Sequence, residues 1–413
     1  MTKISVERNQ LPAGWRAEKI ADIGQWASGG TPSIKDEKLW NGDIPWISAK
    51  DMKISRLRDA FDHVSAKALG NGTRLIPPGS LLMVVRGMIL AHTFPVALAE
   101  SPLAFNQDLK ALIPREDLSS EYLLYWFQAN KETILSIADE ATHGTKRIPT
   151  SALFNLPIHL PPPNEQHAIA SALSNMDALL AKLDQLIAKK RDIKQAAMQE
   201  LLTGRRRLPE FSGGWTVTAL RNLGAWKGGA TPSMANPDFW VNGDVPWASS
   251  GDIKSTTIDA TAKNITELAV ESSSTTVVPA GSVVMVTRSG ILRRYFPVAK
   301  TSKPIAINQD IKALIPASGV DTEFVLQSLL LHGPDILSSC MKAGTTVESV
   351  ELSWLKAYEI DLPSLDEQQA IAALLRDMAA EITALEARRE KTRLIKQGMM
   401  QELLSGRKII SKN

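Results

Sequence analysis

Two carboxylates and a lysine recur at one spacing in two parts of this chain. The two sets are Asp43, Asp51 and Lys53, and then Asp244, Asp252 and Lys254. Carboxylates of this kind can bind a divalent metal ion that activates water, so one hypothesis is a stand-alone metal-dependent endonuclease. Asp-x-Lys is a common pattern, however, and it also occurs at Asp108–Lys110 and Asp310–Lys312. We favour the interpretation that the carboxylates cap local turns and the lysines are exposed.

No other residue pattern in the chain is typical of an active site. Asn236–Phe239 is superficially similar to the Asn/Asp-Pro-Pro-Tyr/Phe motif of adenine methyltransferases, but its third residue is Asp238 and the first copy has Asp36–Leu39 there. We expect a plain turn before Trp240. The six histidines and one cysteine do not cluster as metal ligands, and no glycine-rich phosphate loop is present. The sequence therefore predicts neither catalytic residues nor a metal site on this chain.

These residue sets are paired because the chain contains an internal duplication. Asn106–Pro114 recurs with small changes as Asn308–Pro316, and Gly42–Trp46 as Gly243–Trp247. The offset of about 200 residues far exceeds the period of roughly 20–50 residues that defines solenoid repeats. We infer two related domains that bind two related targets at a set distance.

Composition limits the setting in which these domains work. Hydrophobic residues make up 44% of the chain, enough for a core in each half, and the single Cys340 cannot form an internal disulfide. No signal peptide or membrane span is recognisable, so we expect a protein of the reducing cytoplasm. The net charge of +3 does not by itself indicate nucleic-acid binding. The local cluster Arg205–Arg207 could contact DNA, acidic groups of a partner or only water, and we favour the solvated interpretation.

Each copy begins with a mixed α/β region and ends in a long helix. Buried strands are predicted at Leu81–Val85 and Val283–Thr287, after turn signals. Further strands are expected at Leu109–Ile113 and Ile158–Leu160. Helices are expected near 120–129 and 322–331, and the first long helix is predicted from about Glu165 to Leu202.

The long helices carry a coiled-coil seam. Their apolar residues alternate at spacings of four and three, which is typical of helices that pack along one stripe. The seam residues are Ile169, Leu173, Met176, Leu180, Leu183 and Ile187, and then Ile371, Leu375, Met378, Ile382 and Leu385. Both helices are predicted to stop at a glycine, Gly204 and Gly406. A helix of about 38 residues is roughly 57 Å long.

Connectivity favours an antiparallel helix pair, because a parallel pair would force the second domain to bridge the whole helix length. The predicted order is domain 1 at 1–160, helix at 161–206, domain 2 at 207–362 and helix at 363–413. The predicted fold class is therefore two repeated α/β domains joined by a long antiparallel helical coiled coil, with pseudo-two-fold symmetry.

This organisation resembles the specificity subunit of type I restriction-modification systems. The resemblance covers nearly the whole chain, and its most specific phrases are Leu160–Ile169 and Met198–Arg205, with second copies at Leu362–Ile371 and Met400–Arg407. It implies that each domain is a target recognition domain for one half of a bipartite, asymmetric site on double-stranded DNA. The helices would set the gap between the halves, and this geometry suits half-sites about one DNA turn apart.

The resemblance also implies partners and cofactors. Two methyltransferase subunits would dock on the helices, and restriction/translocase subunits would join for cleavage. S-adenosylmethionine, ATP and Mg²⁺ are expected on those partners, with no cofactor on this chain. Two alternatives stay open: the stand-alone endonuclease, and a scaffold whose paired domains bind protein.

The candidate DNA-binding residues are basic or polar groups at strand ends and in loops, since Lys and Arg neutralise phosphates and Arg can bind guanine edges. They are Arg86, Arg288, Arg293, Arg294, Lys146, Arg147, Thr145, Thr345, Thr346, Ser48, Lys50, Ser249 and Ser250. A solvated or salt-bridged arginine remains the alternative for Arg86 and Arg288. Arg293–Tyr295 replaces Ala91–Thr93 of the first copy, as expected if the two domains recognise different sequences. Trp46 and Trp247 are interpreted as core residues.

Overall fold

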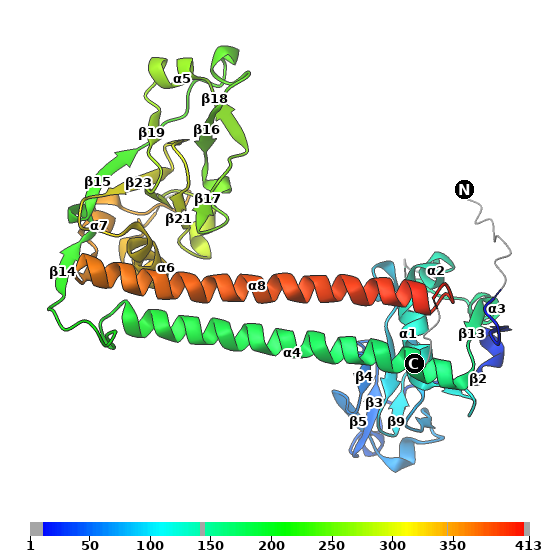
Figure 1. Cartoon of the computed structure of the whole chain (residues 1–413). Coiled ribbons are helices and arrows are strands. Elements are labelled where there is room, and N and C mark those ends of the chain that lie inside the picture. The colour runs from blue at the N-terminus through cyan, green and yellow to red at the C-terminus, as the bar shows by residue number, and fades with distance from the viewer. Residues whose placement is uncertain (1–10, 141–144, 345, 409–413) are drawn as a thin grey trace. The chain divides into compact units, whose positions relative to one another are not determined.

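The computed structural model describes residues 11–140, 145–344 and 346–408, which fall into two compact units. Unit 1 comprises Met1–Asp184 and Arg388–Asn413, and unit 2 comprises Gln185–Ala387. Each unit therefore combines one α/β domain with part of both long helices (Figure 1). Residues 11–160 are termed the first domain and residues 207–362 the second domain.

The first domain is built on two larger sheets, with strand orders β2-β10-β7-β8-β4 and β5-β3-β9-β6. Its strands are β1 (Arg16–Lys19), β2 (Gly24–Ser28), β3 (Ile44–Ile47), β4 (Arg56–Leu57), β5 (Asp62–Val64), β6 (Leu75–Ile76), β7 (Leu81–Val84), β8 (Val96–Ala99), β9 (Leu103–Phe105), β10 (Leu109–Pro114), β11 (Asp139–Glu140), β12 (Lys146–Arg147) and β13 (Pro157–Leu160). Its helices are α1 (Ser120–Ala129), α2 (Lys131–Ser136) and α3 (Thr150–Asn155). Strands β1 and β13 pair separately.

The second domain repeats this topology, with sheets ordered β15-β23-β20-β21-β17 and β18-β16-β22-β19. Its strands are β14 (Thr216–Ala219), β15 (Gly224–Gly228), β16 (Val245–Ala248), β17 (Thr257–Ile258), β18 (Lys263–Ile265), β19 (Thr276–Val278), β20 (Val283–Val286), β21 (Val298–Thr301), β22 (Ile305–Ile307), β23 (Ile311–Pro316) and β24 (Glu359–Leu362). Its helices are α5 (Glu267–Ser272), α6 (Thr322–Cys340) and α7 (Leu352–Ala357).

The central strands of both domains are apolar at every position. All four residues of β7 and of β20 are buried, and each strand is paired on both sides within its sheet. A strand covered on both faces needs a continuous apolar run rather than alternation. The predicted strands are therefore confirmed, although each of these two ends one residue earlier than predicted.

Helix α1 has the predicted bounds, but α6 runs well past the predicted end at 331. It continues through Pro334 to Cys340. In the first domain the corresponding stretch is split, because Asn130 ends α1 and its side-chain amide donates to the Trp126 carbonyl at 2.9 Å. His332 takes that place in the second domain, and the helix continues there. Pro334 lies inside this helix, although an interior proline removes one backbone donor and its ring crowds the carbonyl of the preceding turn.

The two long helices are equal in length. Helix α4 spans Pro163–Leu201 and α8 spans Leu365–Leu403, each with 39 residues. Helix α4 begins two residues before the predicted Glu165, since proline suits the first helical position, where its missing N–H has no intrahelical partner. Gly204 and Gly406 follow the helix ends with positive φ angles of 66° and 74°, as predicted.

The helices run antiparallel within each unit. In unit 1 Asp177 pairs with Lys396 at 2.5 Å, and Asp184 with Arg389. In unit 2 Lys190 pairs with Glu381, and Arg191 with Glu386. Unit 1 uses the start of α4 and the end of α8, whereas unit 2 uses the start of α8 and the end of α4. The predicted fold class, two repeated α/β domains with long antiparallel helices, is confirmed.

Candidate nucleic-acid interface

The structure brings two predicted groups of the first domain together. Arg86, just after β7, lies opposite Arg147 in an antiparallel bridge. Two backbone hydrogen bonds flank the bridge: Ile148 donates to the Val85 carbonyl at 2.9 Å, and Gly87 to the Lys146 carbonyl at 3.0 Å. The paired strands β11 and β12, together with Ile148, are termed the closing hairpin of this domain. An exposed arginine at the strand exit therefore sits beside the exposed arginine of the hairpin.

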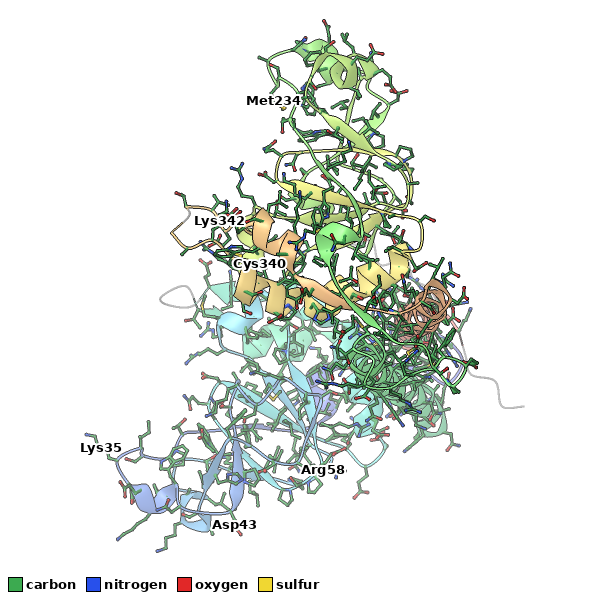
Figure 2. The ribbon with its side chains drawn as sticks, turned by 90° about the vertical axis from the view of Figure 1, so that its left-hand side faces the viewer. Lys35, Asp43, Arg58, Met234, Cys340 and Lys342 are labelled. Carbon is green, nitrogen blue, oxygen red and sulfur yellow. The ribbon has the colours of Figure 1, made fainter. Side chains whose placement is uncertain are left out.

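The second domain forms the same junction with other side chains. Arg288 lies opposite Ser349, and Val350 donates to the Thr287 carbonyl at 2.8 Å. Residues 341–344 and 346–350 are the closing hairpin here, and Met341 bridges Val350 in it. Cys340 ends α6 just before it, and Lys342 projects from its start (Figure 2). The backbone frame is shared, and Glu348 and Ser349 replace Lys146 and Arg147.

The repeated Asn-Gln-Asp turn, just before β10 and β23, also contacts this junction. Asn106 is buried, and its side-chain oxygen accepts from the Asp108 backbone N–H at 3.1 Å. The Asp108 carbonyl in turn accepts from Val85 and Arg86 at 2.8 and 3.2 Å. Asn308 and Asp310 repeat these contacts. Sequence reasoning used this phrase only to find the duplication, although its short polar side chains are typical of such a turn.

The junction of the first domain borders a basic cavity of about 550 Å³. Arg86, Arg147 and Lys110 contribute cationic groups, and Ser28 and Gln107 contribute polar ones. Lys110 is partly buried and donates to the Ser28 hydroxyl at 2.9 Å, and burial lowers the pKa of its amine. An anion such as a phosphate group would relieve this concentration of positive charge. Lys110 was missed because it reads as an ordinary strand residue.

In the second domain, carboxylates accept hydrogen bonds from two guanidinium groups. Asp310 accepts from Nε of Arg288 at 2.7 Å, and Glu348 accepts from Nε of Arg293. The hydrogen bond from Arg293 is the main reason that the pKa of Glu348 is lowered. Burial lowers the pKa of Lys312, while the nearby Asp310 acts to raise it and Arg288 to lower it. The two junctions thus have the same backbone hydrogen bonds, but their side chains carry different charges.

The remaining predicted residues are placed less uniformly. Lys146 pairs with Glu140 at 3.1 Å, and Thr145 is partly buried. Arg294 and Thr346 are exposed, and Thr345 lies outside the described residues. The four others, at the ends of β3 and β16, lie outside the closing hairpins; they are Ser48, Lys50, Ser249 and Ser250. The structure does not bring these four to the junctions.

The carboxylates of the nuclease hypothesis cap turns. Asp51 is only 7% exposed and accepts from the backbone N–H groups of Ser48 and Phe61, both at 2.9 Å. Asp252 makes the same pair of contacts with Ser249 and Ala262. Asp43 projects away from the first domain (Figure 2). Over the described ranges, no group of three or more His, Cys, Asp or Glu could hold a metal ion.

Three other sequence interpretations can be compared with the structure. Trp46 and Trp247 are core residues as predicted, each 7% exposed and each donating to a backbone carbonyl. Asn236 caps the turn at Pro237–Phe239. The solvated interpretation of Arg205–Arg207 is wrong for Arg207, because this side chain pairs with the buried Glu367. A contact across 160 residues leaves no local sequence signal.

The seam residues of the helices are all buried or partly buried. Buried members are Ile169, Leu173, Leu183, Ile187, Ile371, Leu375 and Ile382. Partly buried members are Met176, Leu180, Met378 and Leu385.

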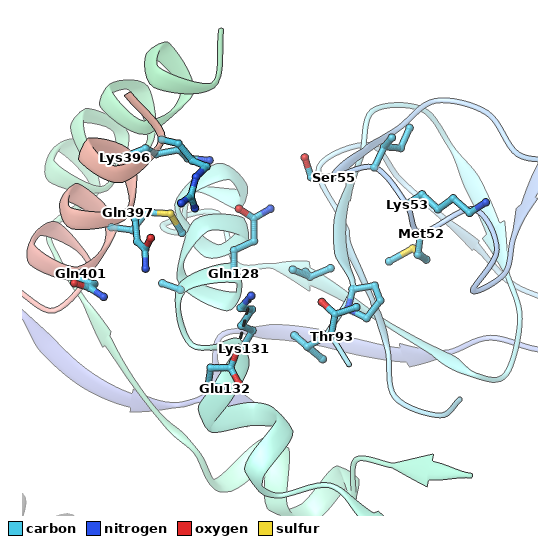
Figure 3. A pocket seen from close by; sticks show the side chains of 17 residues that line it. Met52, Lys53, Ser55, Thr93, Gln128, Lys131, Glu132, Lys396, Gln397 and Gln401 are labelled. Carbon is cyan, nitrogen blue, oxygen red and sulfur yellow. Dashed lines mark ion pairs between the residues drawn. The ribbon is translucent and has the colours of Figure 1, made fainter. Parts of the chain in front are cut away.

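A second face of the long helices has the same residues on α8 and on α4, and it lines a cavity in each unit. This face was not identified from the sequence. In unit 1 a cavity of about 690 Å³ lies between the end of α8 and the first domain (Figure 3). Helix α8 contributes Arg393, Lys396, Gln397, Met400 and Gln401. In unit 2 a cavity of about 350 Å³ is lined by the corresponding Arg191, Lys194, Gln195 and Met198 of α4. Spacings of three and four place these residues on one side of each helix.

Comparison with known proteins gives consistent matches along the chain. The family model described as "Type I restriction modification DNA specificity domain" matches residues 12–190 and 212–394. The chain is 32% identical over 260 residues to the type I restriction enzyme EcoR124I/EcoR124II specificity subunit of Escherichia coli, which covers 62% of either protein. It is 36% identical over 180 residues to the MjaIX specificity subunit of Methanocaldococcus jannaschii, covering 41% of this chain and 40% of that subunit. The chain thus spans less than two thirds of the length of these relatives.

Solved structures share the fold. A chain of a type I R-M system has a TM-score of 0.63 at 16% identity, over 96% of this chain and 98% of that one. An S subunit from M. genitalium has a TM-score of 0.56 at 15% identity, over 98% and 99%. In the described part of the present chain, no helix is long and apolar enough to cross a membrane.

Proposed function

Because the chain belongs to the type I restriction-modification DNA specificity family, we propose that it is the DNA-recognition subunit of such a complex. Each α/β domain binds one half of a bipartite, asymmetric site on double-stranded DNA. The observation that carries this proposal is the shared junction of strand exit and closing hairpin, which presents Arg86 with Arg147 in one domain and Arg288 with Ser349 in the other. The shared backbone arrangement suits two related half-sites. Arg293 and Glu348, where the first domain has Ala91 and Lys146, suit half-sites of different sequence.

The long helices set the gap between the half-sites. The equal length of α4 and α8 supports this role, because the duplication has tolerated many substitutions between them and no change in length. Two methyltransferase subunits dock on the helices. Each of them would meet a helix face of the same residues, with Lys396 and Gln397 on α8 and Lys194 and Gln195 on α4. The first domain completes the first cavity, and α8 completes the second.

The chain itself is non-catalytic. Methylation of adenine belongs to the methyltransferase subunits with S-adenosylmethionine, and cleavage belongs to restriction/translocase subunits with ATP and Mg²⁺. The use of Asp51 and Asp252 as turn caps supports this division, since those carboxylates were the best candidates for metal binding. The complex works in the cytoplasm. Neither the relatives nor the turn geometry favours the stand-alone endonuclease.

The proposal is tested by DNA binding of the purified complex of this chain with its methyltransferase subunits. We expect affinity that falls steeply with salt, because phosphate contacts release counterions, and we expect no cleavage by the chain alone with Mg²⁺. Binding that is absent at every salt concentration would favour the protein scaffold instead. Cleavage by the chain alone would favour the endonuclease.

A further inference from the structure

The second domain carries an oriented guanidinium group that the first domain lacks. Arg293 ends the short 3-10 helix Gly290–Arg293 beside the closing hairpin, and Glu348 of that hairpin accepts from its Nε. The Glu348 backbone is itself fixed, because its carbonyl accepts from Ser289 at 3.0 Å. The ion pair uses Nε–H and leaves the two terminal amino groups of the guanidinium for other partners.

The Arg293–Glu348 pair is not needed to build the fold. The first domain has the same 3-10 helix, Met88–Ala91, and the same hairpin junction, with Ala91 and Lys146 at the two positions. The first domain thus has neither member of the pair. The Arg293 side chain is 70% exposed, and an ion pair that open to water contributes little to stability. Binding of a ligand explains better than stability why the second domain has both residues and the first domain has neither.

The ligand that fits this guanidinium is guanine. Two parallel N–H donors match the O6 and N7 acceptors at the major-groove edge of guanine, and a carboxylate that fixes the side chain reduces the entropy lost on binding. Arg288 beside it is held by Asp310 in the same way, through Nε at 2.7 Å. That second pair has sequence counterparts in the first domain, Arg86 and Asp108, so it does not distinguish the two half-sites.

We propose that Arg293, positioned by Glu348, recognises a guanine in the half-site bound by the second domain. This inference rests on the proposed function, because it assumes that the junction faces DNA. Arg293 selects the base, and Glu348 acts only by holding the guanidinium.

The test is the initial rate of methylation by the complete complex on a DNA library randomised within both half-sites. The variants are R293A, R293K and E348Q. R221A is the matched control, because it removes the same charge from an exposed arginine of the second domain that is not a candidate DNA-binding residue. For the unaltered complex we expect guanine at one fixed position. R293A should reduce the preference for guanine there by roughly 10-fold or more, with every other position unchanged. R293K, which keeps the charge but loses the planar pair of donors, should relax the same position, and E348Q should relax it in part.

Three outcomes would overturn the inference. The first is an R293A complex with unaltered base preference. The second is a uniform fall in rate on all sequences, which indicates a phosphate contact. The third is relaxation by R221A at the same position. A failure of the proposed function would look different, because the unaltered complex would then give no split motif.

Discussion

Arg207 holds the carboxylate of Glu367 through two hydrogen bonds of 2.5 and 2.6 Å, although the two residues are 160 positions apart. Glu367 is 1% exposed and also accepts from the indole N–H of Trp215 at 3.1 Å. The pair joins the segment after α4 to the first turn of α8 within unit 2. It therefore connects the start of the second domain, after α4, to the start of α8, which follows that domain.

Removal of Arg207 should destabilise unit 2. Arg207→Ala leaves a buried carboxylate without its cation, which costs on the order of 3 kcal/mol. Thermal unfolding followed by circular dichroism should show a lower Tm, and adding Glu367→Gln to that variant should restore part of it. Arg205→Ala is the matched control, since it removes an exposed arginine of the same run. Equal Tm values for the two arginine variants would contradict the structural role of the pair.

Acid should weaken the first domain through a charged network at its edge. Arg115 contacts both Glu18 and Asp117, and Arg16 contacts the same two carboxylates. The hydrogen bonds from Arg115 are the main reason that the pKa values of Glu18 and Asp117 are lowered. A carboxylate with a lowered pKa binds fewer protons in the folded state than in the unfolded state. Its stabilisation is therefore present above the ordinary pKa of about 4 and is lost as the pH falls below it.

The measurement is the urea midpoint of each domain between pH 7 and pH 3. Thr218 and Ala317 occupy the positions of Glu18 and Arg115 in the second domain, so that domain serves as an internal control. Glu18→Gln should flatten the loss of stability of the first domain with acid, and Thr218→Gln should change nothing. An unchanged pH profile for Glu18→Gln would show that the network does not couple to folding.

The basic cavity of the first domain should bind DNA phosphate. Arg147→Ser installs the residue of the second domain, and it should weaken DNA binding on all sequences alike. The slope of log affinity against log salt should fall by roughly one. The reciprocal Ser349→Arg should strengthen binding in the same uniform way. A change in base preference with Arg147→Ser would instead place this side chain on a base edge.

Lengthening both helices should lengthen the DNA gap. A seven-residue insertion after Asp184 and another after Ala387 preserve the seam and add about 10.5 Å, or about three base pairs. The methylated motif should keep both half-sites with a longer gap. Insertion in one helix alone shifts the register of the two helices, so that the pairs Asp177–Lys396 and Lys190–Glu381 cannot both form. This single insertion should abolish methylation. An unchanged gap after the double insertion would exclude the helices as the spacer.

Sequence predicted the features that depend on local patterns. The strand Leu81–Val84, the long helices and the core position of Trp46 follow from apolar runs, heptad spacing and flanking turns. The junction at Arg86 was only half predicted, because both arginines were candidates but nothing local indicates that Arg147 lies opposite Arg86. The Arg207–Glu367 pair was missed for the same reason: it joins distant residues. The partners of Arg293 and Lys110 likewise follow from the fold rather than from spacing.

The most direct test of the proposed function is modified-base sequencing of DNA from cells that express this chain with its methyltransferase subunit, compared with cells that lack this chain. The proposed function predicts N6-methyladenine in one split motif with a fixed gap, present only when this chain is present. An active methyltransferase with no such motif, or with one that does not depend on this chain, would contradict it.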